Sequence, residues 1–83
     1  MRMLCITFRS ITPAQRAQRF LHSRGIPAML QRTPRWMEER GCGYCLRLRP
    51  EEGSRVEALL RSQGLAFSKI YEEENGEARE WGL

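Results

Sequence analysis

The chain has 83 residues, of which 41% are hydrophobic and 29% charged, and its 14 Lys and Arg outnumber its 10 acidic residues, giving a net charge of +4. This length predicts one small domain and excludes a two-domain enzyme with a substrate cleft between its lobes. No run approaches the roughly 18 apolar residues of a membrane span, and the N-terminal residues lack a signal-peptide run, so we expect a cytoplasmic protein with no membrane segment.

The first half of the chain has the pattern of a strand, a helix and a second strand. Alternation predicts a half-buried first strand, whose inward residues are Leu4, Ile6 and Phe8. Thr12 is predicted to cap the helix, with Pro13 in the first helical position and Gly25 just past the helix end. Residues 26–30 alternate again and predict the second strand.

The second half repeats this pattern. Residues 46–49 alternate leucine with arginine as a third strand, residues 50–64 have the caps and apolar stripe of a second helix, and residues 67–71 predict a fourth strand. Residues 21–26 also resemble residues 60–65, since each contains a Leu-x-Ser-x-Gly run. The two halves therefore look like equivalent β-α-β units, although convergence on one helix-end chemistry gives the same likeness.

The predicted fold class is α+β. We expect a ferredoxin-like β-α-β-β-α-β arrangement, in which a four-stranded antiparallel sheet carries two helices on one face. The domain is predicted over residues 1–72. Residues 72–83 hold 5 glutamates and 1 arginine, so residues 73–83 are predicted to be an acidic C-terminal tail that shields the basic body, which makes the net charge weak evidence for nucleic-acid binding.

An 11-residue connection between the second and third strands, residues 33–43, is long for a hairpin, and such loops often carry function. It ends in Gly41-Cys42-Gly43, where the glycines leave the thiol open and let backbone amides point at an anion on sulfur. Arg35 and Arg40 are the nearest cations in sequence, and a guanidinium near a thiol favours the nucleophilic thiolate. The alternative is that the glycines only shape a turn and Cys42 has no role.

Two further thiols accompany Cys42. By strand parity, Cys5 and Cys45 point to the sheet face opposite the leucines and lie near each other. They are interpreted as small semi-buried fillers, with Cys45 also a candidate resolving thiol for Cys42. A structural zinc site is disfavoured because only His22 could complete the ligand set. Trp36 is a candidate lid, partner contact or plug of the core.

The remaining patterns favour binding over catalysis. Arg47 and Arg49, with Tyr44 nearby, could form a basic sheet face for RNA, but aromatic residues are scarce there, so a solvated or dimer-covered face is preferred. The chain contains no Asp and one His, which excludes a Ser-His-Asp set and leaves little acid–base machinery.

Over residues 3–72 the chain resembles the family of small proteins described as putative Se/S carrier-like. The residues that carry the resemblance are Ile6-Thr7-Phe8 with Ser10, Gly25-Ile26-Pro27, Thr33-Pro34-Arg35, Cys42-Gly43, and Leu46-Arg47 leading to Pro50-Glu51. Gly53 departs from the pattern, since an apolar residue is expected there, and it should weaken the second helix by about 0.5–1 kcal/mol relative to Ala.

The resemblance implies a carrier that holds sulfur or selenium on Cys42 as a persulfide or selenopersulfide and passes it between a donor and an acceptor protein. Gly43 would present its amide to the cargo, while Thr33, Pro34 and Arg35 would shape and charge the pocket. The loop from Trp36 to Arg40 would meet the partners. Such a protein is a stoichiometric carrier rather than an enzyme, with no cofactor. The alternative is a non-catalytic homodimeric binding or regulatory module, with RNA binding through its sheet face as a further variant.

Overall fold

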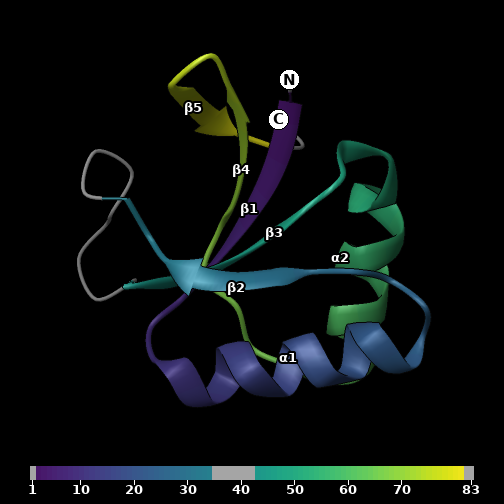
Figure 1. Ribbon diagram of the computed structural model, residues 1–83. Helices are drawn as coiled ribbons and strands as arrows, with labels where there is room; N and C mark the ends of the chain where they lie inside the picture. Colours follow the sequence, from purple (N-terminus) through teal and green to yellow (C-terminus); the bar gives the residue numbers. More distant parts are fainter. Residues whose placement is uncertain (1, 35–42, 82–83) are drawn as a thin grey trace.

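The computed structural model describes residues 2–34 and 43–81. In chain order, these residues form β1 (Arg2–Phe8), α1 (Ile11–Ser23), β2 (Met29–Arg32), β3 (Tyr44–Leu48), the 3-10 turn η2 (Pro50–Glu52), α2 (Gly53–Ser62), β4 (Ile70–Glu74) and β5 (Glu77–Glu80). The strands pair antiparallel in the order β2-β3-β1-β4-β5 (Figure 1). The fold is therefore α+β, with two helices and one antiparallel sheet.

The expected number of four strands is wrong, because β4 and β5 form a hairpin at the C-terminal side of the chain. Asn75 and Gly76 connect them with φ values of 55° and 81°. A two-residue hairpin turn of type I′ needs a positive φ at both central residues, and its twist matches that of the flanking strands. Asn-Gly is the preferred sequence for this turn. Glutamates that we expected in a tail therefore lie in strands, and Glu74 pairs with Glu77 in register. The division of the chain after residue 72 stays a prediction.

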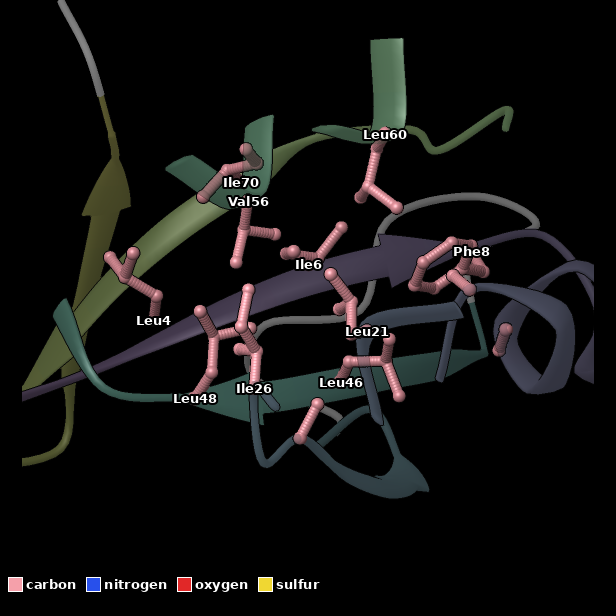
Figure 2. Close-up of a cluster of buried hydrophobic side chains, with 13 residues drawn as sticks. Leu4, Ile6, Phe8, Leu21, Ile26, Leu46, Leu48, Val56, Leu60 and Ile70 are labelled. Atoms are coloured by element: carbon pink, nitrogen blue, oxygen red, sulfur yellow. The ribbon is translucent and has the colours of Figure 1, made fainter. Parts of the chain in front are cut away.

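Both helices cover the same face of the sheet and share one core with it. Its fully buried members come from β1, α1, β3, α2 and the connection after α1, and include Leu4, Ile6, Phe8, Leu21, Ile26, Leu46, Leu48, Val56 and Leu60. Figure 2 shows the side chains of β1 and β3 pointing toward those of the helices. Alternate residues of the strands face the opposite side of the sheet, where Cys5 and Cys45 form a second buried cluster with Tyr71 and Ala78. No helix in residues 2–34 and 43–81 is long and apolar enough to cross a bilayer.

The two helices end in the same way, as the Leu-x-Ser-x-Gly repeat predicted. Gly25 and Gly64 follow the helix ends with φ values of 76° and 65°. After α1, the Ile26 amide donates to the Leu21 carbonyl at 2.9 Å, and after α2 the Leu65 amide donates to the Leu60 carbonyl at 3.0 Å. Both pairs are the long hydrogen bond of a Schellman motif, which needs a left-handed residue where each glycine stands.

Several sequence-based boundaries differ from the structure. Helix α1 begins at Ile11 with Ser10 as N-cap, so the Thr12 cap is wrong and Pro13 is the third helical residue rather than the first. Strand β3 covers Tyr44–Leu48 rather than residues 46–49, and Pro50–Glu52 form a 3-10 turn before α2. Strand β2 begins at Met29, because the preceding apolar residues are buried without pairing in the ladder. Strand β4 runs over Ile70–Glu74 rather than residues 67–71, since the N-terminal half of β1 pairs with its glutamates as far as Arg2 with Glu74.

The packing around Gly53 explains why a glycine stands in the first turn of α2, which the sequence pattern did not reveal. A Cβ at this position would lie 2.6 Å from Leu4 Cδ1 and 2.8 Å from Trp81 Cζ2. The indole of Trp81 therefore packs directly on the start of α2, and only glycine leaves room for it. Gly53 lowers the helix propensity of α2, but it allows Trp81 to pack closely against the core.

Candidate functional site

The long connection between β2 and β3 is closed at its base by the backbone. The Thr33 amide donates to the Gly43 carbonyl at 3.0 Å, one pair beyond the last registered pair of the two strands, Arg32 with Tyr44. Thr33 is buried and Pro34 is half-buried. Four of the predicted site residues, Arg35, Trp36, Arg40 and Cys42, lie outside the described residues. The described part of the predicted site is therefore its base, Thr33, Pro34 and Gly43, together with Cys45, the predicted resolving thiol.

Two thiols lie close together on the sheet face opposite α1 and α2. Cys5 pairs with Arg47 in register, and Thr7 pairs with Cys45, so the cysteines occupy diagonal positions of adjacent strands. Both are fully buried and both are free thiols. Diagonal Cα atoms are about 7–8 Å apart, beyond the roughly 4.4–6.8 Å that a disulfide spans. The geometry thus favours two thiols in contact over a bond between them, and it confirms that the cysteines face away from the leucines.

The surroundings of Cys45 favour its thiolate. The pKa of Cys45 is lowered from 9.0 to about 7. The main cause is a hydrogen bond from the Cys5 thiol, which outweighs the opposing effect of burial. The side chains of Thr33 and Gln31 and the charge of Arg47 lower the pKa further. Gln31 pairs with Cys45 in register, and Met29 pairs with Arg47. Edge strand β2 therefore supplies a donor to the sulfur from the side opposite Cys5. A thiolate is the nucleophilic form of cysteine.

Cys5 has the opposite tendency. Its hydrogen bond to Cys45, its burial, and the negative charges of Cys45 and Glu73 raise its pKa, and the Arg47 charge only partly offsets them. The Glu73 carboxylate lies 4.0 Å from the Cys5 sulfur. The opposite directions of the two pKa shifts favour the negative charge on Cys45 and the remaining proton on Cys5.

Glu73 and Arg47 form an ion pair beside the two thiols. The Arg47 side chain is 31% exposed and that of Glu73 15% exposed. Among the described residues, the Arg47 Nε and the Thr33 hydroxyl are buried without a hydrogen-bond partner. Both residues favour a negative charge on Cys45, and a buried polar group without a partner is costly.

Sequence reasoning found the two thiols of this cluster but missed the polar residues around them. Gln31 and Thr33 alternate on β2 and its extension, so strand parity would have put both on the face of Cys45. Glu73 was missed because the fourth strand was expected to end at residue 71. The ion pair to Glu73 also compensates the charge of Arg47, which weakens the interpretation of this sheet face as an RNA-binding surface.

The described residues contain no cluster of three His, Cys, Asp or Glu side chains that could hold a metal ion. His22 is exposed on α1, and its Nε2 lies 3.3 Å from the Ala28 carbonyl. The polar groups around Cys45 are donors or a cation, a set suited to a negative charge on sulfur rather than to a metal ion.

Comparison with known proteins gives one match. The family model described as "putative Se/S carrier protein-like" matches residues 3–72. The match begins in β1 and ends in β4, so it includes the long connection and all three cysteines. No curated protein and no solved structure matches the chain.

Proposed function

The chain belongs to the putative Se/S carrier protein-like family, and from that premise we propose that it accepts a sulfur or selenium atom from a donor protein and passes it to an acceptor protein. The cargo-bearing atom in this proposal is the sulfur of Cys42. The observation that carries the proposal is the family match itself, because it spans the Cys42-Gly43 pair and the Thr33-Pro34-Arg35 run. The protein acts as a stoichiometric carrier and needs no cofactor.

The strand order supports a ferredoxin-like interpretation of the fold. The order β2-β3-β1-β4, with both helices on one face, is the one that a β-α-β-β-α-β chain adopts in ferredoxin-like domains. In this interpretation β5 is an addition at the β4 edge. Because such folds serve many functions, the architecture supplies a rigid support for the site and does not identify its chemistry.

The base of the connection supports an anionic cargo. Thr33 and Gly43 join the two ends of the segment that contains Cys42. Next to them the Arg32 guanidinium stacks on the Tyr44 ring, 5.3 Å from its centroid, and donates to its hydroxyl at 3.4 Å. Arg32 is exposed, so its charge is available to an anion at this end of the sheet. A persulfide or selenopersulfide anion gains from a nearby guanidinium, and Arg35 would add a second.

The transfer requires only a thiolate and a sulfur or selenium donor. The Cys42 thiolate attacks the terminal atom of the donor persulfide, the sulfur–sulfur bond of the donor breaks, and the donor leaves as a thiolate. The acceptor removes the atom from Cys42 by the same step. Cys45 stays the predicted resolving thiol, whose attack on the inner sulfur would release the cargo as sulfide and leave a disulfide. Its burial slows that side reaction, which favours delivery over discharge.

The experiment that tests the proposal is intact-mass measurement after exposure of the reduced protein to a persulfide donor. We expect a gain of one sulfur atom at Cys42, located by peptide mapping, and the loss of that modification in Cys42→Ser. Arg35→Met should slow loading, whereas Arg16→Met on the exposed face of α1 is the matched control. A Cys42 thiol that stays unmodified while a free cysteine in the same solution is loaded would contradict the proposal.

A further inference from the structure

The cluster around Cys45 contains more hydrogen-bond donors than the thiol pair uses. Among the described residues, the Thr33 hydroxyl and the Arg47 Nε are buried and have no partner. Thr33 is 5% exposed. Both groups act on Cys45 in the same direction, since each favours a negative charge on its sulfur. Cys5 supplies a third donor. The cluster thus has unused capacity to bind an anion at one defined atom.

A simple packing role explains this arrangement poorly. Cysteines that only fill space on a sheet face need no more than apolar neighbours. Ala78 and Tyr71 already provide such contacts. A buried arginine Nε and a buried hydroxyl without partners would then be a net cost. A negative charge held in this cluster would offset that cost by accepting hydrogen bonds from such donors.

We propose that Cys45 is a second sulfur-accepting site, distinct from Cys42, which takes a sulfane sulfur from a small organic persulfide and holds it as a buried persulfide anion. Cys5 is the positioning residue that donates to the inner sulfur, and Thr33 and Arg47 stabilise the outer one. The proposal takes its kind of cargo from the proposed function but uses none of residues 35–42.

The step balances without an oxidant or reductant. The Cys45 thiolate attacks the terminal sulfur of a persulfide R–S–SH, so a new sulfur–sulfur bond forms at Cys45 while the one in the donor breaks. The donor leaves as R–S⁻ and takes the persulfide proton to become R–SH. The products are the Cys45 persulfide anion and a neutral thiol, with one negative charge on each side of the reaction.

The proposal assigns the approach of the donor to the ion pair of Arg47 with Glu73, whose carboxylate lies 4.0 Å from the Cys5 sulfur. Both side chains are partly exposed, whereas both cysteines are fully buried. A small persulfide can therefore reach Cys45 only when the side chains that cover it move apart. A substitution of Glu73 that weakens the ion pair should therefore speed the reaction. The same substitution removes the carboxylate that lies 4.0 Å from the Cys5 sulfur.

Glu72 offers a matched control for Glu73. It lies on the same strand, its side chain has the same 15% exposure, and it pairs with Arg2 at 2.9 Å. Thr7 is the control for Thr33, because it is 2% exposed and its hydroxyl is occupied by the Lys69 backbone at 3.1 and 3.3 Å. Each control removes the same kind of group without touching the unused donors.

The experiment exposes the Cys42→Ser protein to cysteine persulfide and follows the sulfur by peptide mapping over time. We expect one added sulfur on Cys45, formed several-fold faster in Glu73→Gln than in the parent, with Glu72→Gln unchanged. Thr33→Val should slow loading several-fold below neutral pH, because Thr33 lowers the pKa of Cys45, while Thr7→Val should not. Circular dichroism of each variant checks that it is folded.

Each result decides the proposal. No sulfur on Cys45 after exposure long enough to load a free cysteine fully would overturn it, as would equal acceleration by Glu73→Gln and Glu72→Gln, which would indicate general loosening. The same mapping on the wild-type chain separates the two hypotheses. Loading of Cys42 alone refutes this inference and leaves the carrier function intact, and loading of Cys45 alone does the reverse.

Discussion

The Cys5 thiol faces the Glu73 carboxylate, with 4.0 Å between Sγ and Oε1. The hydrogen bond to Cys45 and burial raise the pKa of the Cys5 thiol most, and the Glu73 carboxylate raises it further. Cys45, one strand over, is surrounded by donors that lower its pKa. Two residues of the same type therefore differ in charge state because a carboxylate lies beside one and donors lie beside the other.

A titration of thiolate absorbance in the Cys42→Ser protein should resolve one ionisation near pH 7. The transition belongs to Cys45, so it should vanish in Cys45→Ser. In Cys5→Ala it should move to higher pH, because the Cys5 hydrogen bond is the largest cause of the lowered pKa. If Cys5→Ala left the midpoint unchanged, the two thiols would not be in contact.

The stability of the protein should depend on pH through the same pair. The unfolded chain holds both protons up to about pH 9.0, whereas the folded pair loses one near pH 7. Between these values the unfolded state binds more protons, so the free energy of unfolding rises with pH. Above pH 9.0 the unfolded chain loses both protons while Cys5 keeps its own, and the stability falls again. Denaturant melts from pH 6 to pH 10 measure this maximum, which should be absent when both cysteines are replaced by alanine.

Replacing Gly53 by Ala should destabilise the protein although Ala is the better helix former. The helix gains about 0.5–1 kcal/mol, but the new Cβ would lie within 2.8 Å of Trp81 and within 2.6 Å of Leu4. Overpacking of this kind costs about 1–3 kcal/mol, so we expect a net loss of about 1 kcal/mol in a chemical melt.

The exposed neighbour Ser54 provides the control, since Ser54→Ala should be neutral or slightly stabilising. In a Trp81→Ala background, Gly53→Ala should cost less than in the wild type. An unchanged cost there would mean that Trp81 does not pack on α2.

The helix-end glycines should respond alike. Gly25→Ala and Gly64→Ala each force an L-residue into the left-handed region, at φ values of 76° and 65°. Each should lower the free energy of unfolding by about 1–2 kcal/mol. No atom lies within 4 Å of a Cβ at either position, so the loss would come from backbone strain alone. A much larger loss at one of the two sites would show that the repeated motifs are not equivalent.

Local chemistry made most of the fold predictable. Three patterns specify structure within a few residues: the alternation in β1 and β3, the glycines after both helices, and the Leu-x-Ser-x-Gly repeat. The structure contains the strands and helix ends that these patterns predict. The β4–β5 hairpin was equally local, because Asn75-Gly76 is a strong turn signal. It was missed because the surrounding glutamates were interpreted as a tail. Their place in the ladder depends on pairing with β1, which is more than 60 residues away.

The thiol cluster was only partly predictable for the same reason. Strand parity placed Cys5 and Cys45 on one face, but their different charge states come from Glu73 and Thr33, which lie on strand β4 and beyond the end of β2. Gly53 is similar, since its role depends on Trp81 at the far end of the chain. Such contacts between distant segments are invisible to periodicity and composition.

Release of cargo from Cys42 is the most direct test of the carrier function. The protein is loaded with isotope-labelled sulfur, separated from the donor and mixed with an excess of a small acceptor thiol. We predict that the label leaves Cys42 as a persulfide of the acceptor and that the Cys42 thiol is recovered free. Label that stays on the protein, or leaves as sulfide with a disulfide formed between Cys42 and Cys45, would contradict a carrier function.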